Sequence, residues 1–381
     1  MMDVVISGVG EAGIGRSTDR TALQLQAEAA SIAAADAGIE LASIDAVFSS
    51  KTSDLGPGDR PAMEVAEYLG IRPSYMDSTL AGGAAPVLQV MHAVAAIRAG
   101  FCTRALITYG STQASSRQRR LGGHRREGDV TRQFEQAASL PAPIGIAALA
   151  ARRHMSEFGT TSEQLASVAV SQRRWAQLNP EALRRAPLTV ADVLASPMIA
   201  DPLHRDDICM VSDGAGAVIV QRGDSKSGQA LIKGFGEAHS HFSVLASLPL
   251  TSTVAVDSSR RAFEMAGVTH EDIDLLQIYD AFTILPLVLL GDLGFAERGS
   301  VGELVASGAM APGGRLPMNT QGGGLSHCHP GVYGIFLVIE AVRQLRRQAG
   351  DRQVDSTLAL VQASGGGAFG GSQATLILGR S

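Results

Sequence analysis

The order in which short apolar runs and longer helical patterns alternate is the feature of this sequence that most limits its fold. Val4 to Ser7 is a short apolar run, and an alanine-rich pattern with helical periodicity follows from Thr21 to Ala37. A second run, Asp45 to Ser50, precedes a second helical pattern at Pro61 to Leu69. Strands and helices that alternate in this way build a sheet with helices on its faces. The first part of the chain is therefore predicted to be α/β.

The same order of elements returns later in the chain. After a mostly helical stretch, the strand-like run Ala215 to Gln221 leads back to a sheet, and the rhythm restarts at Ala230 to Phe235. Because we find no repeat of 20 to 50 residues, the duplication is one of architecture. The predicted parts are an N-terminal half (residues 1–110 and 203–225), an inserted helical lobe (111–202) and a C-terminal half (226–381).

Composition excludes several classes of protein. With 381 residues, 45% of them hydrophobic, the chain can bury more than one core. The formal net charge of −5 gives no support to a nucleic-acid or anionic-membrane partner. Cys102, Cys209 and Cys328 are too scattered for a disulfide framework. The first residues lack a basic region followed by an apolar region, so we expect no signal peptide, and the longest apolar stretch, Phe282 to Leu290, is too short for a membrane span. We expect a cytoplasmic protein with no membrane span.

Residues Gly8 to Gly13 have the Gly-x-Gly-x-x-Gly spacing of dinucleotide-binding loops. In such loops the helix begins among the glycines, whereas the capping residues Ser17 to Asp19 place the helix start later here. A flexible loop between strand and helix is the alternative, and we favour it.

A small-residue loop with two histidines lies directly before an amphipathic helical pattern at Val332 to Arg347. The loop contains His327, Cys328 and His329. Near the positive end of a helix dipole a histidine is favoured in its neutral form, which can act as a base or as a hydrogen-bond donor to an oxyanion. The same position favours a thiolate at Cys328, although a small, semi-buried residue is the alternative. Tyr279 ends another strand pattern.

Several short motifs occur in an informative order. They are Ala81-Gly82-Gly83, Ser212-Asp213-Gly214-Ala215, Tyr279-Asp280-Ala281-Phe282, Cys328-His329-Pro330 and Gly365-Gly366-Gly367. Together they resemble the thiolase superfamily, and most of all its lipid-transfer or sterol-carrier-protein-x branch. The resemblance spans nearly the whole chain. It implies a thiolase fold, with two repeated α/β halves in a five-layered αβαβα core and an inserted helical loop lobe.

Compared residue by residue with that family, the chain lacks the thiolase nucleophile. The position of the nucleophilic cysteine is Gly83, and that of the second catalytic cysteine is Ala363. The asparagine of the Asn-Glu-Ala-Phe motif is replaced by Tyr279. The histidine of the Gly-His-Pro motif is kept as His329, with Cys328 in place of the glycine. The resemblance thus implies binding of acyl-CoA thioesters without the usual covalent chemistry.

The remaining groups fit a retro-aldol reaction, in which a base deprotonates a β-hydroxyl and the departing thioester enolate is stabilised. We expect Tyr279 and His329 to be the acid/base and enolate-stabilising pair. Backbone amides that can approach the thioester lie at Gly82, Gly83, Gly365 and Gly366. Thiolase-like steroid side-chain aldolases resemble the chain in their Tyr-Asp-x-Phe motif and missing nucleophile. They usually carry a tyrosine where this chain has His329, which leaves the assignment of base and acid open.

The leading hypothesis is therefore cleavage of a β-hydroxyacyl-CoA. Two alternatives stay open: an acetyl-CoA acetyltransferase-like enzyme that uses Cys328, and a non-catalytic CoA-ester-binding subunit. Coenzyme A enters as part of the substrate, and we expect no covalently bound cofactor and no metal. The resemblance also implies a homodimer and a small OB-fold and zinc-ribbon partner protein. The arginine-rich run Arg117 to Arg126 fits either CoA phosphates or an acidic partner, or else a solvated loop.

Overall fold

The computed structural model describes residues 3–50, 60–116, 142–223, 229–244, 249–365 and 369–380, together with residues 135, 138 and 140. Its centre is a mixed nine-stranded sheet in the order β3-β2-β4-β7-β1-β8-β11-β10-β9. The nine strands are β1 (Val4–Gly15), β2 (Ala46–Ser49), β3 (Tyr75–Asp77), β4 (Arg104–Ser111), β7 (Asp213–Arg222), β8 (Ala230–His239), β9 (Leu275–Ile278), β10 (Leu358–Gly365) and β11 (Ser372–Arg380). A separate two-stranded sheet pairs β5 (Met198–Ala200) with β6 (Leu203–His204).

The nine strands divide into two halves where β1 meets β8. These two strands share the register pairs Val5 with Leu231 and Ile6 with Ala230, whereas β1 pairs with β7 along most of its length. In chain order within each half, the strands lie as third-second-fourth-fifth-first in the first half, and as first-fifth-fourth-second in the second. The third strand of the second half is reduced to one parallel bridge between Leu276 and Met318. The predicted repetition of two α/β halves is confirmed.

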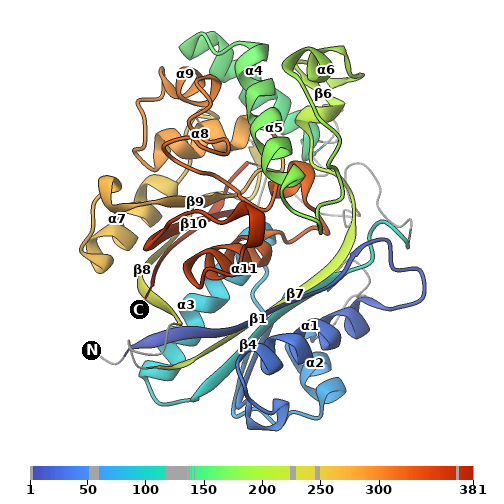
Figure 1. The fold of residues 1–381 in the computed structure, drawn as a ribbon, viewed down its shortest axis with the longest axis vertical. Helices are drawn as coiled ribbons and strands as arrows, with labels where there is room; N and C mark the ends of the chain where they lie inside the picture. The colour runs from blue at the N-terminus through green and yellow to red at the C-terminus, as the bar shows by residue number, and fades with distance from the viewer. Residues whose placement is uncertain are drawn as a thin grey trace.

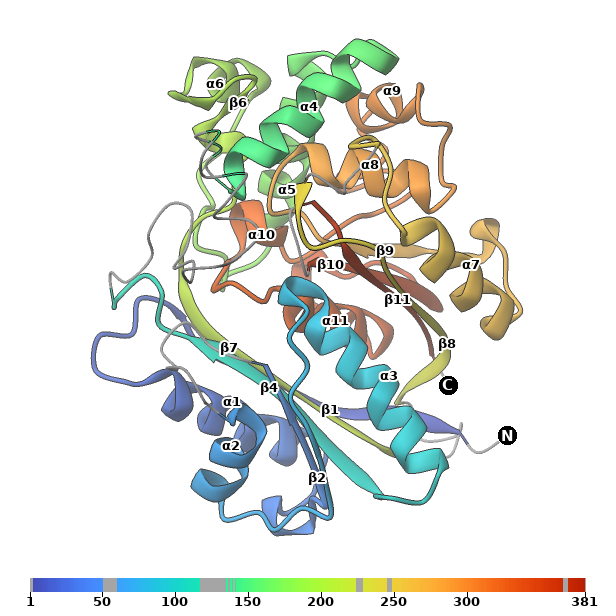
Figure 2. The same cartoon turned by 180° about the vertical axis from the view of Figure 1, so that it is seen from behind.

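Helices form the outer and central layers of the molecule (Figure 1). The helices α1 (Ala22–Asp36) and α2 (Pro61–Leu69) pack on the first half, and α7 (Ala255–Ala266) packs on the second. Between the halves, α3 (Ala85–Arg98) contacts α11 (Gly334–Leu345), as both views show (Figures 1 and 2). Nearly all side chains of these two helices are buried, because both are apolar around most of their circumference. This is the predicted αβαβα arrangement.

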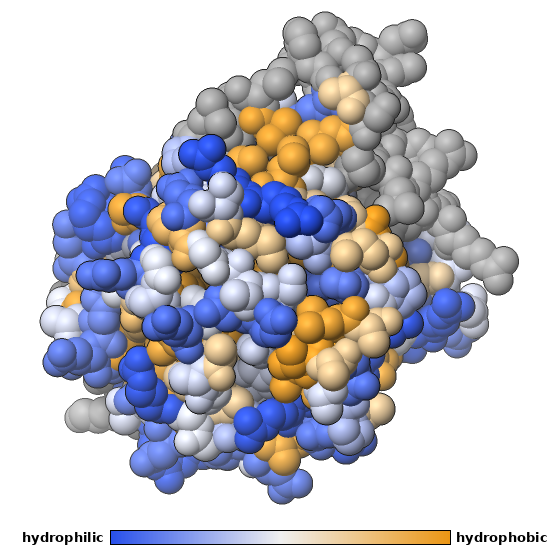
Figure 3. Space-filling model, turned by 90° about the horizontal axis from the view of Figure 1, so that it is seen from above, coloured by the Kyte–Doolittle hydropathy of each residue, from blue (hydrophilic) through white to orange (hydrophobic). Residues whose placement is uncertain are grey.

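The helical lobe lies beside the second half of the sheet (Figure 1). Its helices are α4 (Ile144–Phe158), α5 (Ser162–Gln177) and α6 (Val190–Ala195). Two helices from the C-terminal part of the chain, α8 (Ile284–Asp292) and α9 (Val301–Ala306), pack against α4 and α5. Figure 3 looks down on this end and shows a mainly hydrophilic face with separate hydrophobic patches. None of the helices in the described part of the chain combines the length and apolar character that a membrane span requires.

The glycine-rich segment Gly8 to Gly13 is not a loop, and that prediction is wrong. It lies inside the long strand β1. A β-carbon at Gly8 or Gly10 would overlap the main chain of α1, so these glycines allow the helix to lie directly on the strand. The helix itself begins at Ala22, where Thr21 forms a capping box with Gln24.

Candidate active site

The second strand of the C-terminal half, the loop before α11 and the residues before α3 meet at one cavity of about 440 Å³. Of the predicted site residues, the following line it: Gly82, Gly83, Tyr279, His329 and Gly365. Gly366 and the arginine-rich run of residues 117–126 lie outside the described residues. Sequence motifs separated by some 280 positions therefore lie at the same cavity.

Tyr279 follows directly after β9 and points its hydroxyl at two groups of the histidine loop. The hydroxyl donates a hydrogen bond to the carbonyl oxygen of Gly331 at 2.9 Å and lies 3.3 Å from Nε2 of His329. The donor in the contact between Tyr279 and His329 depends on the imidazole tautomer, and an Nε2 that carries no proton can act as a base. Burial raises the pKa of Tyr279, which keeps the phenol neutral at physiological pH.

His329 is held between two aromatic rings. Its imidazole meets the Tyr279 ring edge to face, at a centroid distance of 5.9 Å, and stacks on Tyr333 at 5.6 Å. The main-chain N–H of His329 donates to Oγ of Ser212 at 3.0 Å. Because α11 begins at Gly334, the histidine lies in the preceding loop and not in the first turn of the helix. The ring is nevertheless held by the stacked Tyr333 and by the contact of the Tyr279 hydroxyl with Nε2.

Gly83 and Gly365 lie where two parts of the main chain approach closely. A β-carbon at Gly83 would overlap the Tyr279 ring, and one at Gly365 would overlap the carbonyl oxygen of Ala81. The space into which a side chain at position 83 would project is therefore filled by the tyrosine. Gly83 belongs to the short 3₁₀ turn that leads into α3, so its amide lies near the positive end of the helix dipole. Amides in such a position can stabilise an oxyanion.

Cys328 and His327 lie behind the cavity. Neither is among its described lining residues, and both are fully or almost fully buried. Burial raises the pKa of Cys328 well above its usual value and lowers that of His327. The expected thiolate at Cys328 is therefore opposed by its surroundings, because an apolar interior disfavours the charged form. Sγ lies 3.6 Å from Nδ1 of His327.

Two residues of the site have roles that the sequence did not reveal. Cys209 lines the cavity and donates its main-chain N–H to the carbonyl oxygen of Ala281 at 2.9 Å. Asp280 is buried and accepts hydrogen bonds from the main-chain N–H groups of Gly324 at 2.7 Å and Leu325 at 3.4 Å. Burial raises the pKa of Asp280 to about 7. The glycine run at residues 322–324 indicated that another group approaches this main chain closely. The sequence did not indicate that this group is Asp280.

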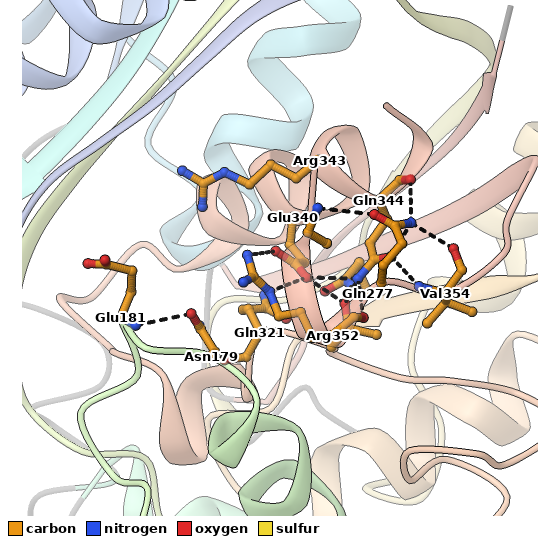
Figure 4. Close-up of polar contacts among 12 residues, drawn as sticks. Asn179, Glu181, Gln277, Gln321, Glu340, Arg343, Gln344, Arg352 and Val354 are labelled. Atoms are coloured by element: carbon orange, nitrogen blue, oxygen red, sulfur yellow. Dashed lines mark hydrogen bonds and ion pairs between the residues drawn. The ribbon is translucent and has the colours of Figure 1, made fainter. Parts of the chain in front are cut away.

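A buried polar network supports the same loop from behind (Figure 4). The carboxylate of Glu340, on α11, pairs with the guanidinium of Arg352 through contacts of 2.9 and 3.0 Å. It also accepts a hydrogen bond from Thr320 at 2.7 Å. Gln277, on β9, donates to the Thr320 hydroxyl at 3.3 Å. The network thus joins the strand before Tyr279 to the start of the segment that carries His329.

The chemistry available in the cavity is that of a phenol, an imidazole, the Cys209 thiol, the Ser364 hydroxyl and main-chain amides. No Asp, Glu, Lys or Arg is among its described lining residues. Within the described ranges, no group of three or more His, Cys, Asp or Glu side chains is placed to hold a metal ion.

Comparisons with known proteins agree with this arrangement. A family model described as "Thiolase C-terminal domain-like" matches residues 236–380. An acetyl-CoA acetyltransferase of Methanothermobacter thermautotrophicus is 31% identical over 366 residues, which are 93% of this chain and 94% of the relative. A steroid side-chain-cleaving aldolase of Thermomonospora curvata is 32% identical over 389 residues, 95% of each chain.

Among solved structures, one described as "Ltp2-ChsH2(DUF35) aldolase" superposes with a TM-score of 0.87 and 29% identity, over 99% of this chain and 98% of the other. Relatives above 30% identity thus extend over almost the full chain. The chain belongs to the thiolase superfamily, in its sterol-carrier-protein-2-like branch.

Proposed function

We propose that this protein cleaves the bond between the α and β carbons of a β-hydroxyacyl-CoA by a retro-aldol reaction, without a covalent acyl-enzyme. The observation that carries the proposal is that glycine, Gly83, occupies the position of the thiolase nucleophilic cysteine. No thiol is present there, and the ring of Tyr279 fills the space while its hydroxyl lies 3.3 Å from His329. The similarity to a steroid side-chain-cleaving aldolase over 95% of both chains supports this assignment.

The reaction begins when a base takes the proton of the β-hydroxyl. We assign this step to the imidazole of His329, because the raised pKa of Tyr279 makes its phenolate too costly at neutral pH. The C–O bond then becomes a carbonyl, the α–β bond breaks, and its electron pair enters the thioester enolate. The imidazolium returns its proton to the α carbon, directly or through the Tyr279 hydroxyl, so both groups regain their starting protonation states. The products are a ketone or aldehyde and a shortened acyl-CoA.

The enolate oxygen needs hydrogen-bond donors during this sequence. The amides near Gly83 and Gly365 lie beside the start of α3, where the helix dipole favours developing negative charge. The Tyr279 hydroxyl is a further donor when it releases Gly331.

The cavity favours an acyl group without charge. Its described lining is largely aromatic and aliphatic, with the buried residues Phe282, Leu285 and Phe369 and the exposed residues Leu80 and Phe242. A carboxylate on the acyl chain would have no lysine or arginine among these residues to pair with. We therefore propose a neutral, predominantly apolar β-hydroxyacyl group.

Assembly with other chains belongs to the same proposal. The similar structure described as "Ltp2-ChsH2(DUF35) aldolase" is named for a second component, which supports a partner protein here. We propose that this partner is a small OB-fold and zinc-ribbon protein. We also propose a homodimer, and we propose that the protein acts in the cytoplasm with CoA present only as part of the substrate.

Replacement of Tyr279 by Phe tests the proposal, because it keeps the ring that fills the space at Gly83 and removes only the hydroxyl. With a panel of steroid, aromatic and aliphatic β-hydroxyacyl-CoAs, we expect turnover to fall about 100-fold or more, with CoA-ester binding retained. Mass spectrometry of the shortened acyl-CoA and the carbonyl product measures the reaction. Tyr75→Phe, on the edge strand β3, is the matched control.

The mechanism is wrong if Tyr279→Phe keeps turnover within threefold of the wild type. A complex that stays fully active after both Tyr279→Phe and His329→Gln would identify this chain as a binding subunit whose partner supplies the chemistry.

A further inference from the structure

We propose that Asn319 and Ser212 are positioning residues that set the distance between Tyr279 and His329. The side chain of Asn319 forms two hydrogen bonds, and Ser212 also forms two, with the main chain of the segment that carries one member of the pair. Neither is among the described residues that line the cavity, so they act through the pair and not on the substrate. The expected effect of these residues on turnover rests on the proposed function. Their role in placing Tyr279 and His329 does not.

Asn319 continues the sheet at a point where the main chain leaves it. The strand β9 is an edge strand, and its Leu276 exchanges hydrogen bonds with Pro317 and Asn319 at 2.9 Å each. At Asn319 the main chain turns away with φ of 52°, a left-handed conformation that asparagine tolerates better than most residues. Its side chain takes over the pairing: Oδ1 accepts the N–H of Ile278, and Nδ2 donates to the carbonyl oxygen of Ile278, both at 2.7 Å.

This pairing fixes the residue immediately before Tyr279. On the other side of the strand, the N–H of Tyr279 donates to Gln362 at 2.9 Å, so the main chain is held from both edges at the point where the tyrosine begins. A carboxamide is suited to this task because it offers one acceptor and one donor side by side. An aspartate in place of Asn319 would keep the acceptor and direct a second oxygen at the Ile278 carbonyl.

Ser212 holds the histidine segment in a comparable way. Its Oγ accepts the N–H of His329 at 3.0 Å, and its own N–H donates to the carbonyl oxygen of His329 at 3.4 Å. The serine is almost fully buried and is itself anchored by the next residue. The buried carboxylate of Asp213 accepts the N–H groups of Ser17 at 2.8 Å and Ala114 at 2.7 Å. The position of His329 is thereby tied to the start of β7.

The two attachments come from different parts of the chain, and together they define one distance. Asn319 places Tyr279 relative to the second half of the sheet, and Ser212 places His329 relative to the first half. A displacement of about 1 Å between reacting groups can cost about 100-fold in rate. Loss of either attachment is therefore expected to lower kcat while leaving KM for the CoA ester nearly unchanged.

The test compares Ser212→Ala and Asn319→Asp with Ser258→Ala. Ser258 is a suitable control because it is fully buried and hydrogen-bonded to Thr375 at 2.8 Å. We expect kcat to fall 10- to 100-fold in the first two variants, with KM within threefold of the wild type. The control should lose thermal stability to a similar extent and keep kcat within twofold. Equal losses of kcat in Ser212→Ala and Ser258→Ala would overturn the inference.

A second readout does not depend on turnover. The imidazole resonance of His329, assigned by its loss in His329→Gln, should shift in Ser212→Ala and stay in place in Ser258→Ala. A shift in a protein that cleaves none of the offered substrates would refute the proposed function and support the positioning role. An unshifted resonance would overturn the positioning role whatever the activity.

Discussion

The two halves of the molecule share an order of strands but contribute different groups to the cavity. In the first half, β3 pairs with β2 over three residues, from Tyr75 to Asp77, and a short connection then leads into α3. In the second half, the corresponding strand is a single bridge at Met318, and a longer segment runs on to α11. The first half supplies main-chain groups at Gly82 and Gly83, whereas the second supplies the side chains of Tyr279 and His329.

The difference shows what the shortened strand makes possible. Where β3 continues as a strand, its main chain satisfies the edge of β2. Where the third strand stops at Met318, the side chain of Asn319 satisfies the edge of β9, and the main chain is released to form the loop that carries His329. The half whose third strand is reduced to one bridge is therefore the half that carries the side chains of Tyr279 and His329.

The central helices differ in the same sense. The interior of α3 is apolar apart from Gln89, which donates to the hydroxyl of Ser50 at 3.3 Å. The interior of α11 carries the charged residue Glu340, paired with Arg352. The second half therefore depends on a buried ion pair for the support of its loop.

The largest expected effect follows from that pair. Glu340→Gln keeps the shape of the side chain but removes the carboxylate that pairs with the buried guanidinium of Arg352. Breaking one partner of a buried pair costs about 3–5 kcal/mol, and we expect a loss of this size in urea unfolding. The control is Glu264→Gln, which removes an exposed partner of Arg260 on α7 and should change stability by less than about 0.5 kcal/mol. Similar losses of stability in both variants would show that the buried ion pair of α11 contributes no more than an exposed one.

Asp280 predicts a pH dependence that belongs to the second half. Because burial raises its pKa to about 7, the folded state binds this proton more tightly than the unfolded state between about pH 4 and pH 7. Stability therefore falls as pH rises through this window, by an amount on the order of 4 kcal/mol for three pKa units.

Unfolding of the wild type and of Asp280→Asn at several pH values from 4 to 8 measures the difference. The variant should lose this part of the slope, while Asp257→Asn, at an exposed site, should keep it. A wild-type slope that persists in Asp280→Asn would assign it to another group.

Local signals were enough to predict much of the fold. The helix α2 begins at Pro61 and ends at Leu69, as predicted, since proline at the first turn and glycine at the C-cap are local features. The β1 glycines misled the prediction because their role depends on α1, which packs on them from outside the motif.

The site was predictable in part for a different reason. Order and spacing of motifs identified Tyr279 and His329, and the structure brings them together. The attachments of Ser212 and Asn319 span 117 and 41 positions, respectively, and no local pattern encodes them. The approach of the Tyr279 ring to Gly83 is likewise visible only after folding.

A methyl group at Gly83 tests the contribution of the first half directly. Gly83→Ala would press a β-carbon into the Tyr279 ring, and we expect a loss of about 1–3 kcal/mol in stability together with a large loss of turnover. Gly299→Ala, where a β-carbon meets open space, should be close to neutral. In a Tyr279→Ala background the cost of Gly83→Ala should largely disappear. Additive costs in the double variant would show that the two positions do not compete for one space.

The smallest effect is expected at Cys328, and it decides against the covalent alternative. Because the thiol is buried behind the cavity and its pKa is raised, Cys328→Ala should keep turnover within twofold. Intact-protein mass spectrometry after incubation with acetyl-CoA, acetoacetyl-CoA and longer acyl-CoAs should show no acyl adduct on this residue. An adduct at Cys328, together with inactivation of Cys328→Ala, would mean that the second half has regained a nucleophile behind the histidine. The protein would then be an acyltransferase. The Tyr279 ring beside Gly83 would fill the place of a nucleophilic thiol whose role Cys328 has taken over.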